Sequence, residues 1–181
     1  MTGKASKASG FIPWASYVYA REEARRRGDR RVGTEHVLLG LLHEPEVAEV
    51  LGCDLAAARE ALDTMDHDAL VAVGIDRELD APPVPTREPV LRGRGAIVKA
   101  ALRDRLPMTP VAKRTLEASG KDRRGGRGSG APWDPSPRWS RERVLIALLS
   151  LAPPDPAAAL LDALEVDRDR VGARLNDSSA A

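Results

Sequence analysis

Hydrophobic and polar positions along the chain follow the spacing of amphipathic helices. The clearest apolar stripe consists of Val37, Leu38, Leu41 and Leu42. Thr34 stands before this stripe as an N-cap, because its side-chain oxygen can accept a hydrogen bond from a free backbone N–H. Glu35 follows in the first turn, where a carboxylate suits the positive end of the helix dipole. The pattern therefore predicts a helix over residues 35–42.

Start signals predict the remaining helices in the same way. Asp, Ser or Thr as the capping residue, often followed by proline, marks most of the starts. The expected caps are Asp54, Thr109, Ser140, Asp155 and Asp167. The predicted helices cover residues 14–27, 45–51, 55–65 (which residues 66–74 can extend), 96–105, 110–119 and 141–149, and two more follow residues 155 and 167.

Composition agrees with a helical domain. The 181 residues are 43% hydrophobic but only 3% aromatic, and the abundance of Ala and Leu favours helices over strands. A single cysteine excludes an internal disulfide framework. The formal net charge is +1, so nothing global indicates a membrane or nucleic acid as the partner. No apolar run reaches the length of a membrane span, and a cytoplasmic location is the default expectation.

Two segments of the chain repeat one pattern. Residues 34–42, TEHVLLGLL, align with residues 141–149, RERVLIALL. Further along, and after an insertion of six residues, three positions of the first half align with Leu164, Asp167 and Leu175. Each half reads as four short helices whose apolar stripes are buried against the other half. The sequence therefore predicts an all-α fold of two four-helix repeats related by a pseudo-twofold axis.

Composition along the chain sets the expected boundaries. Residues 1–10 form a small, polar tail, residues 11–75 the first repeat, residues 76–106 a proline-rich linker plus one helix, and residues 107–177 the second repeat. A glycine- and arginine-rich loop over residues 120–138 interrupts the second repeat. Both repeats are expected to form a single domain.

Motifs in both halves resemble the Clp N-terminal repeat domain, or Clp R domain, which stands at the front of ClpC- and ClpA-type protein unfoldases. They are EEAR at residues 22–25, VGTEHVLLGL at residues 32–41 and PMTPVAKRTLE at residues 107–117. The resemblance spans roughly residues 11–175. It implies a docking role: such domains receive adaptor proteins, and in ClpC-type proteins they capture substrates tagged with phosphoarginine, without any chemistry of their own.

The motor of that family has no counterpart in this sequence. Nucleotide phosphates would require a Walker loop, G-x-x-x-x-G-K-[ST]. Gly120-Lys121 is the nearest candidate, but Thr115 stands at the first glycine position and Asp122 at the hydroxyl position. The sequence therefore predicts a stand-alone docking domain that is not an enzyme and needs no cofactor.

The resemblance implies a ligand site at the start of the second helix of each repeat. In members that bind phosphoarginine, the glutamate of the G-T-E-H motif contacts the guanidinium, which carries this role to Glu35 and Glu142. A carboxylate can accept two parallel N–H bonds from a guanidinium, and free N–H groups at a helix start can bind the phosphate. Thr34 matches the motif, whereas Ser140 and Arg141 depart from it: Arg141 either pairs with Glu142 and blocks the site, or holds the phosphate. The alternative is that both glutamates only suit helix dipoles, at about 0.3–1 kcal/mol each.

A second surface, between the repeats, is also implied by the resemblance. In ClpC-type domains this region receives adaptors and antibacterial cyclic peptides. The matching positions are Tyr17, Val18, Pro107, Met108, Lys113 and Glu117. The family commonly has an aromatic residue where Met108 stands, and methionine keeps an adaptable apolar contact but loses stacking. The alternative is that Met108 packs internally.

Other chemistry finds little support in the sequence. His36 and His43 lie seven positions apart but have no third ligand at suitable spacing, so no metal site is predicted. Cys53 has no C-x-x-C partner and is expected to fill an apolar gap.

The predicted function is a non-enzymatic module that binds adaptors, phosphoarginine-tagged substrates or cyclic peptides and modulates Clp-dependent proteolysis, as a decoy or as an adaptor. The alternative is a small helical regulator that binds nucleic acid through the basic loop, where Arg123, Arg124 and Arg127 form an RGG-like run. The sequence leaves the physiological ligand, the state of the second site and the oligomeric state open.

Overall fold

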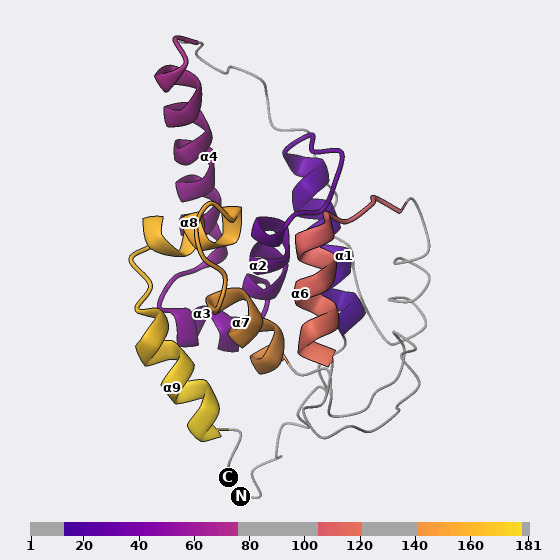
Figure 1. The fold of residues 1–181 in the computed structure, drawn as a ribbon, viewed down its shortest axis with the longest axis vertical. Helices are drawn as coiled ribbons and strands as arrows, with labels where there is room; N and C mark the ends of the chain where they lie inside the picture. Colours follow the sequence, from indigo (N-terminus) through magenta and orange to yellow (C-terminus); the bar gives the residue numbers. More distant parts are fainter. Residues whose placement is uncertain (1–12, 76–104, 121–140, 179–181) are drawn as a thin grey trace, which may run out of the picture.

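The computed structural model describes residues 13–75, 105–120 and 141–178, and every structural statement below concerns these residues. They form eight α-helices (Figure 1): α1 (Pro13–Arg26), α2 (Thr34–Leu42), α3 (Pro45–Leu51), α4 (Leu55–Ala72), α6 (Pro110–Gly120), α7 (Arg141–Leu149), α8 (Pro156–Ala163) and α9 (Arg168–Ser178). The described ranges contain no β-strand, only an isolated bridge between Val32 and Met108. The predicted all-α class is therefore confirmed, whereas its division into two repeats stays a prediction.

Helix α2 lies at the centre of the molecule, with α1, α7 and α8 packed around it (Figure 1). Eight of its nine residues are buried, so α2 is enclosed on every side rather than along a single stripe. Gly40 brings α1 close to it. A Cβ atom at this position would lie 2.5 Å from the carbonyl oxygen of Ser16 and 2.8 Å from the backbone nitrogen of Ala20. The backbones of α1 and α2 are therefore in direct contact at this glycine.

Apolar residues from distant parts of the chain enter one core. Its largest members, none more than 1% exposed, are Leu38, Leu39, Leu41, Leu145, Leu148, Leu160 and Leu161. Burying each such side chain stabilises the fold by about 1.5–3 kcal/mol relative to leaving it in water. A single core therefore joins the described parts of the first and second halves of the chain.

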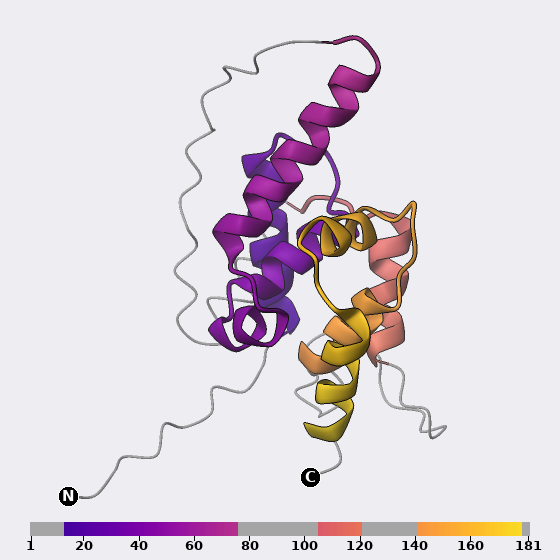
Figure 2. The ribbon, with the colours of Figure 1, turned by 90° about the vertical axis from the view of Figure 1, so that its left-hand side faces the viewer.

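Helix α4 is the exception to this packing. It runs to Ala72, so the turns that residues 66–74 can add to the predicted helix are present. Its last turns project beyond the other helices in both views (Figures 1 and 2). Val71, Val73 and Ile75 at this end are 45%, 70% and 48% exposed. None of the helices in the described ranges is long and apolar enough to cross a membrane.

Four of the predicted caps are confirmed by hydrogen bonds from their side chains. Asp54 accepts from the N–H of Ala57 at 2.8 Å, and Asp155 accepts from the N–H of Ala157 at 3.0 Å. Asp167 and Thr109 accept in the same way, at 2.9 Å and 3.2 Å, from residues three positions on. These caps act within one helical turn, and for that reason the local sequence predicts them.

The predicted role of Thr34 as an N-cap is wrong. Gly33 holds the cap position in an extended conformation, and Thr34 is the first residue of α2. The Thr34 side chain is buried, and its hydroxyl donates to Oδ1 of Asp155 at 2.8 Å. The physical reason is that the extended backbone ends at Gly33, so Thr34 already has helical geometry and its side chain is not placed to accept from the N–H groups of the first turn. Its hydroxyl instead donates a charge-assisted hydrogen bond to the distant carboxylate.

Several predicted segments lie outside the described residues. They are the tail at residues 1–10, most of the linker at residues 76–106 with its helix at residues 96–105 up to residue 104, the loop at residues 120–138 from residue 121 on, and the cap at Ser140.

Candidate binding site at the start of α2

The loop before α2 is held against a second segment of the chain. Val32 donates its backbone N–H to the Pro107 carbonyl at 2.9 Å and accepts from the N–H of Thr109 at 2.8 Å. Tyr17 on α1 adds to this contact, since its hydroxyl donates to the Leu106 carbonyl at 3.0 Å. The residues before α2 and before α6 are therefore tied together, which fixes the position of the α2 start.

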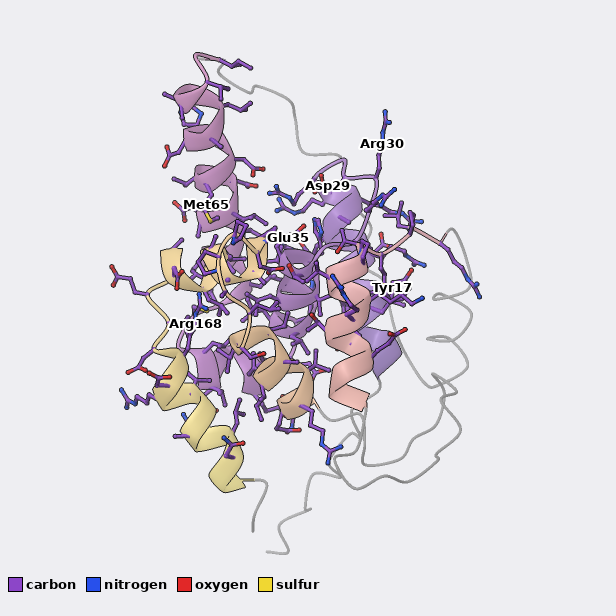
Figure 3. All side chains as sticks on the ribbon, viewed as in Figure 1. Tyr17, Asp29, Arg30, Glu35, Met65 and Arg168 are labelled. Carbon is purple, nitrogen blue, oxygen red and sulfur yellow. The ribbon has the colours of Figure 1, made fainter. Side chains whose placement is uncertain are left out.

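Glu35 is the one residue of α2 that is not buried. Figure 3 labels Glu35 near the centre of the picture, and its side chain is 15% exposed. The carboxylate folds back over Gly33, so that a Cβ atom at position 33 would overlap its Oε1 and Oε2 atoms. Glycine at position 33 is therefore what leaves room for this conformation.

The two carboxylate oxygens of Glu35 have different surroundings. Oε1 lies 2.9 Å from Nδ1 of His36. Oε2 is buried and has no hydrogen-bond partner within residues 13–75, 105–120 and 141–178. An unsatisfied buried acceptor costs about 1–3 kcal/mol, and more when it is charged. The described fold therefore keeps a strong acceptor at this point without using it.

His36 connects Glu35 to the preceding loop. Its Nε2 atom lies 3.0 Å from Oδ2 of Asp29, and its Nδ1 atom lies 3.0 Å from the backbone nitrogen of Gly33. Nδ1 thus faces an N–H donor and a carboxylate acceptor, which require opposite protonation states of this nitrogen. When Glu35 turns away, the Gly33 N–H still provides a partner for Nδ1.

The Glu35 carboxylate is held in its charged form. Burial alone would raise its pKa, but the hydrogen bond and charge of His36, with smaller contributions from the Glu35 backbone N–H and from Arg27, lower this pKa below its ordinary value. The carboxylate is therefore ionised at neutral pH. Once turned outward, it can accept two parallel N–H bonds from a guanidinium.

At the start of α7, Glu142 is covered by its own neighbour. The Nε atom of Arg141 donates to Oε1 of Glu142 at 3.2 Å, and its Nη1 atom lies 3.2 Å from Oε2 of Glu44 and 3.1 Å from Oε2 of Glu46. The Arg141 and Glu142 side chains are each 31% exposed. Of the two alternatives for Arg141, the pairing with Glu142 is the one that the structure contains. Ser140 lies outside the described residues.

The residues predicted for the adaptor groove differ in their burial. Pro107, Lys113 and Glu117 are exposed, Tyr17 and Met108 are half-buried, and Val18 is 0% exposed. Met108 packs against the core, which agrees with the alternative that this side chain packs internally. Val18 belongs to the core as well and offers no surface to a ligand, because it lies on the inner face of α1.

The remaining candidates make contacts inside the fold. His43 stacks on Tyr19 with ring centroids 4.2 Å apart, and its Nε2 atom lies 2.9 Å from Oε1 of Glu23. Burial, with a contribution from Asp54, raises the pKa of the Cys53 thiol, which makes it less nucleophilic. No group of three or more His, Cys, Asp and Glu side chains in the described ranges could hold a metal ion.

Sequence reasoning missed the carboxylates that contact the two helix starts. Asp155, Glu44 and Glu46 reach Thr34 or Arg141 from 95 to 121 positions away. The available signal was their place at the starts of α8 and α3, as Asp155-Pro156 and Glu44-Pro45-Glu46. That a carboxylate at one helix start faces the start of another helix can be recognised only when the packing of the helices is known.

Comparison of the chain with protein-family models, with curated proteins and with solved structures found no significant match. The resemblance to the Clp N-terminal repeat domain therefore stays a prediction that rests on the motifs in this sequence.

Proposed function

We propose that this chain is a non-enzymatic protein-binding module that binds a guanidinium group at the start of α2. The phosphoarginine-binding Clp N-terminal domains, which the chain resembles, bind their ligand in this way. The observation that carries the proposal is the Glu35 carboxylate, with one buried oxygen that has no partner among the described residues. Ligands of such a module are adaptors or phosphoarginine-tagged proteins of a ClpC-type unfoldase. The module either delivers these ligands to the unfoldase, as an adaptor, or keeps them from it, as a decoy.

Binding requires the Glu35 side chain to turn outward from Gly33. Three features favour this movement. The carboxylate gains hydrogen bonds that its Oε2 atom lacks among the described residues, and the His36 ring keeps the Gly33 N–H as a partner. The α2 backbone stays in place, because both the N–H and the carbonyl of Val32 are hydrogen-bonded to the segment before α6. A guanidinium therefore meets a fixed helix start with one movable side chain.

Reciprocal contacts support the proposed pair of repeats. Thr34, the first residue of α2, bonds to Asp155 directly before α8. Arg141, the first residue of α7, contacts Glu44 directly before α3. Each contact joins the start of the second helix of one predicted repeat to the start of the third helix of the other. This exchange is what a pseudo-twofold axis between α2 and α7 would produce.

The connections that follow support the same arrangement. Gly52 after α3 and Glu165 after α8 both have left-handed backbones, with φ of 74° and 54°. Each stands two positions before a capping aspartate, Asp54 or Asp167. Glutamate adopts this conformation rarely, so its presence at the aligned position indicates that the turn itself is repeated.

Replacing Glu35 tests the proposed site. In calorimetric titrations with a phosphoarginine-bearing peptide, Glu35→Gln is expected to bind about 10- to 100-fold more weakly than wild type, because a neutral amide replaces charge-assisted hydrogen bonds worth about 1.5–3 kcal/mol. Glu60→Gln, at an exposed position of α4, is the matched control and is expected to bind like wild type. Equal binding by wild type and Glu35→Gln would contradict the proposal.

A further inference from the structure

Arg141 occupies an unusual position for a cation. It is the first residue of α7, where the positive end of the helix dipole disfavours a positive charge. Three carboxylates offset this cost: Glu142 on the same helix, and Glu44 and Glu46 at the start of α3. Because Arg141 uses both Nε and Nη1 for these contacts, it binds as a guanidinium and not as a mere point charge.

The three carboxylates carry more negative charge than one guanidinium neutralises. Burial raises the pKa of Glu44, contact with Arg141 lowers it, and the charges of Glu46 and Glu142 raise it again, with a net increase. The cluster is therefore suited to a cation and would disfavour a phosphate group. This argues against the alternative in which Arg141 holds a ligand phosphate.

The start of α2 provides the contrast. There Thr34 stands at the position of Arg141 and offers a neutral hydroxyl, which is bonded to Asp155. The Glu35 carboxylate above it keeps an oxygen without a partner among the described residues. One helix start therefore holds a guanidinium of this chain, and the other holds an acceptor that no described residue uses.

We propose that Arg141 is an internal ligand, whose guanidinium fills the Glu142 site and limits the wild-type chain to one external guanidinium, at Glu35. This inference rests on the proposed function, because it treats the two helix starts as the same kind of site. The Arg141 side chain is 31% exposed, so it closes the site at the surface, where a substitution can remove it. Once Arg141 is removed, the site is expected to accept an external, unmodified arginine side chain in its place.

The test is an NMR titration of the full chain with Nα-acetyl-arginine amide. Arg141→Ala is expected to show saturable shifts at the amides of Glu142 and of the α3 start. Its apparent affinity at this site is expected to be about tenfold or more above that of wild type, because a competing charge-assisted contact is removed. The double variant Arg141→Ala/Glu142→Gln is expected to lose this gain. Arg141→Gln, which keeps a polar, unbranched side chain but removes the guanidinium and its charge, serves where the alanine variant does not fold.

The outcomes separate this inference from the proposed function. No gain at α7 in either Arg141 variant, or saturable shifts at α7 already in wild type, would overturn the internal-ligand role while leaving binding at Glu35 intact. A gain at α7 without any binding at α2 would support the internal-ligand role and contradict the function proposed for Glu35.

Discussion

Gly40→Ala is expected to lower the free energy of unfolding by about 3 kcal/mol, near the upper end of what overpacking a well-packed core costs. The added Cβ atom would lie less than 3 Å from two backbone atoms of α1, the Ser16 oxygen and the Ala20 nitrogen. Backbone atoms within a helix cannot turn aside as a side chain can. The substitution must therefore separate α1 from α2 and open the core around it. Chemical denaturation monitored by circular dichroism measures the effect.

Gly172→Ala is the matched control for this substitution. A Cβ atom at Gly172 would meet no atom within 4 Å, and this glycine also lies inside a helix, α9. Alanine there is expected to stabilise the chain by about 0.5–1 kcal/mol through its higher helix propensity. The same chemical change thus has opposite signs at the two sites. A similar effect at both positions would contradict the close approach of α1 and α2.

Glu23→Gln is expected to destabilise the chain by about 3–5 kcal/mol, the cost of breaking a buried ion pair by removing one partner. The Glu23 side chain is 3% exposed and accepts hydrogen bonds from Arg59 on α4, Arg26 on α1 and His43 after α2. Glutamine keeps the shape but removes the negative charge that Arg26 and Arg59 contact. Glu49→Gln is the control, because Glu49 is 78% exposed and lies 3.9 Å from Arg174, and a change within about 0.5 kcal/mol is expected.

The pH dependence of the Glu23 effect follows from its pKa. Burial would raise this pKa, but hydrogen bonds from His43 and Arg59 and their charges lower it from the ordinary 4.5 to about 2. A carboxylate whose folded-state pKa is lowered stabilises the fold above its unfolded-state pKa and loses that contribution as the pH falls through its folded-state pKa. The stability difference between wild type and Glu23→Gln should therefore narrow as the pH falls from 4.5 towards 2. A difference that stays constant over this range would contradict the role of the Glu23 charge.

The parts of the fold that depend on neighbouring residues were predictable from the sequence. The aspartates at positions 54, 155 and 167 cap their helices through hydrogen bonds within one turn, so their effect is local. The course of α2 was also predictable, because its apolar positions and the glutamate in its first turn are adjacent in the sequence. Its burial on every side was not, since this depends on the helices that surround it.

The parts of the site that depend on long-range contacts were not predictable. Thr34 reads as a cap, yet its hydroxyl bonds to Asp155, 121 positions away. For Arg141 the sequence left two roles open, and the contact with Glu44, 97 positions away, accompanies its pairing with Glu142. Motif matching identified the residues at both helix starts, whereas the partner of each residue followed only from the packing of α3 and α8 against these starts.

The claim at the centre of this account is that the start of α2 accepts a guanidinium group through Glu35. Its most direct measurement is a per-residue NMR titration with free phosphoarginine, which reports affinity, location and the number of sites together. The account predicts saturable shifts centred on the amides of Gly33, Thr34, Glu35 and His36, which Glu35→Gln abolishes. Shifts that are absent from these amides, or that persist unchanged in Glu35→Gln, would contradict it.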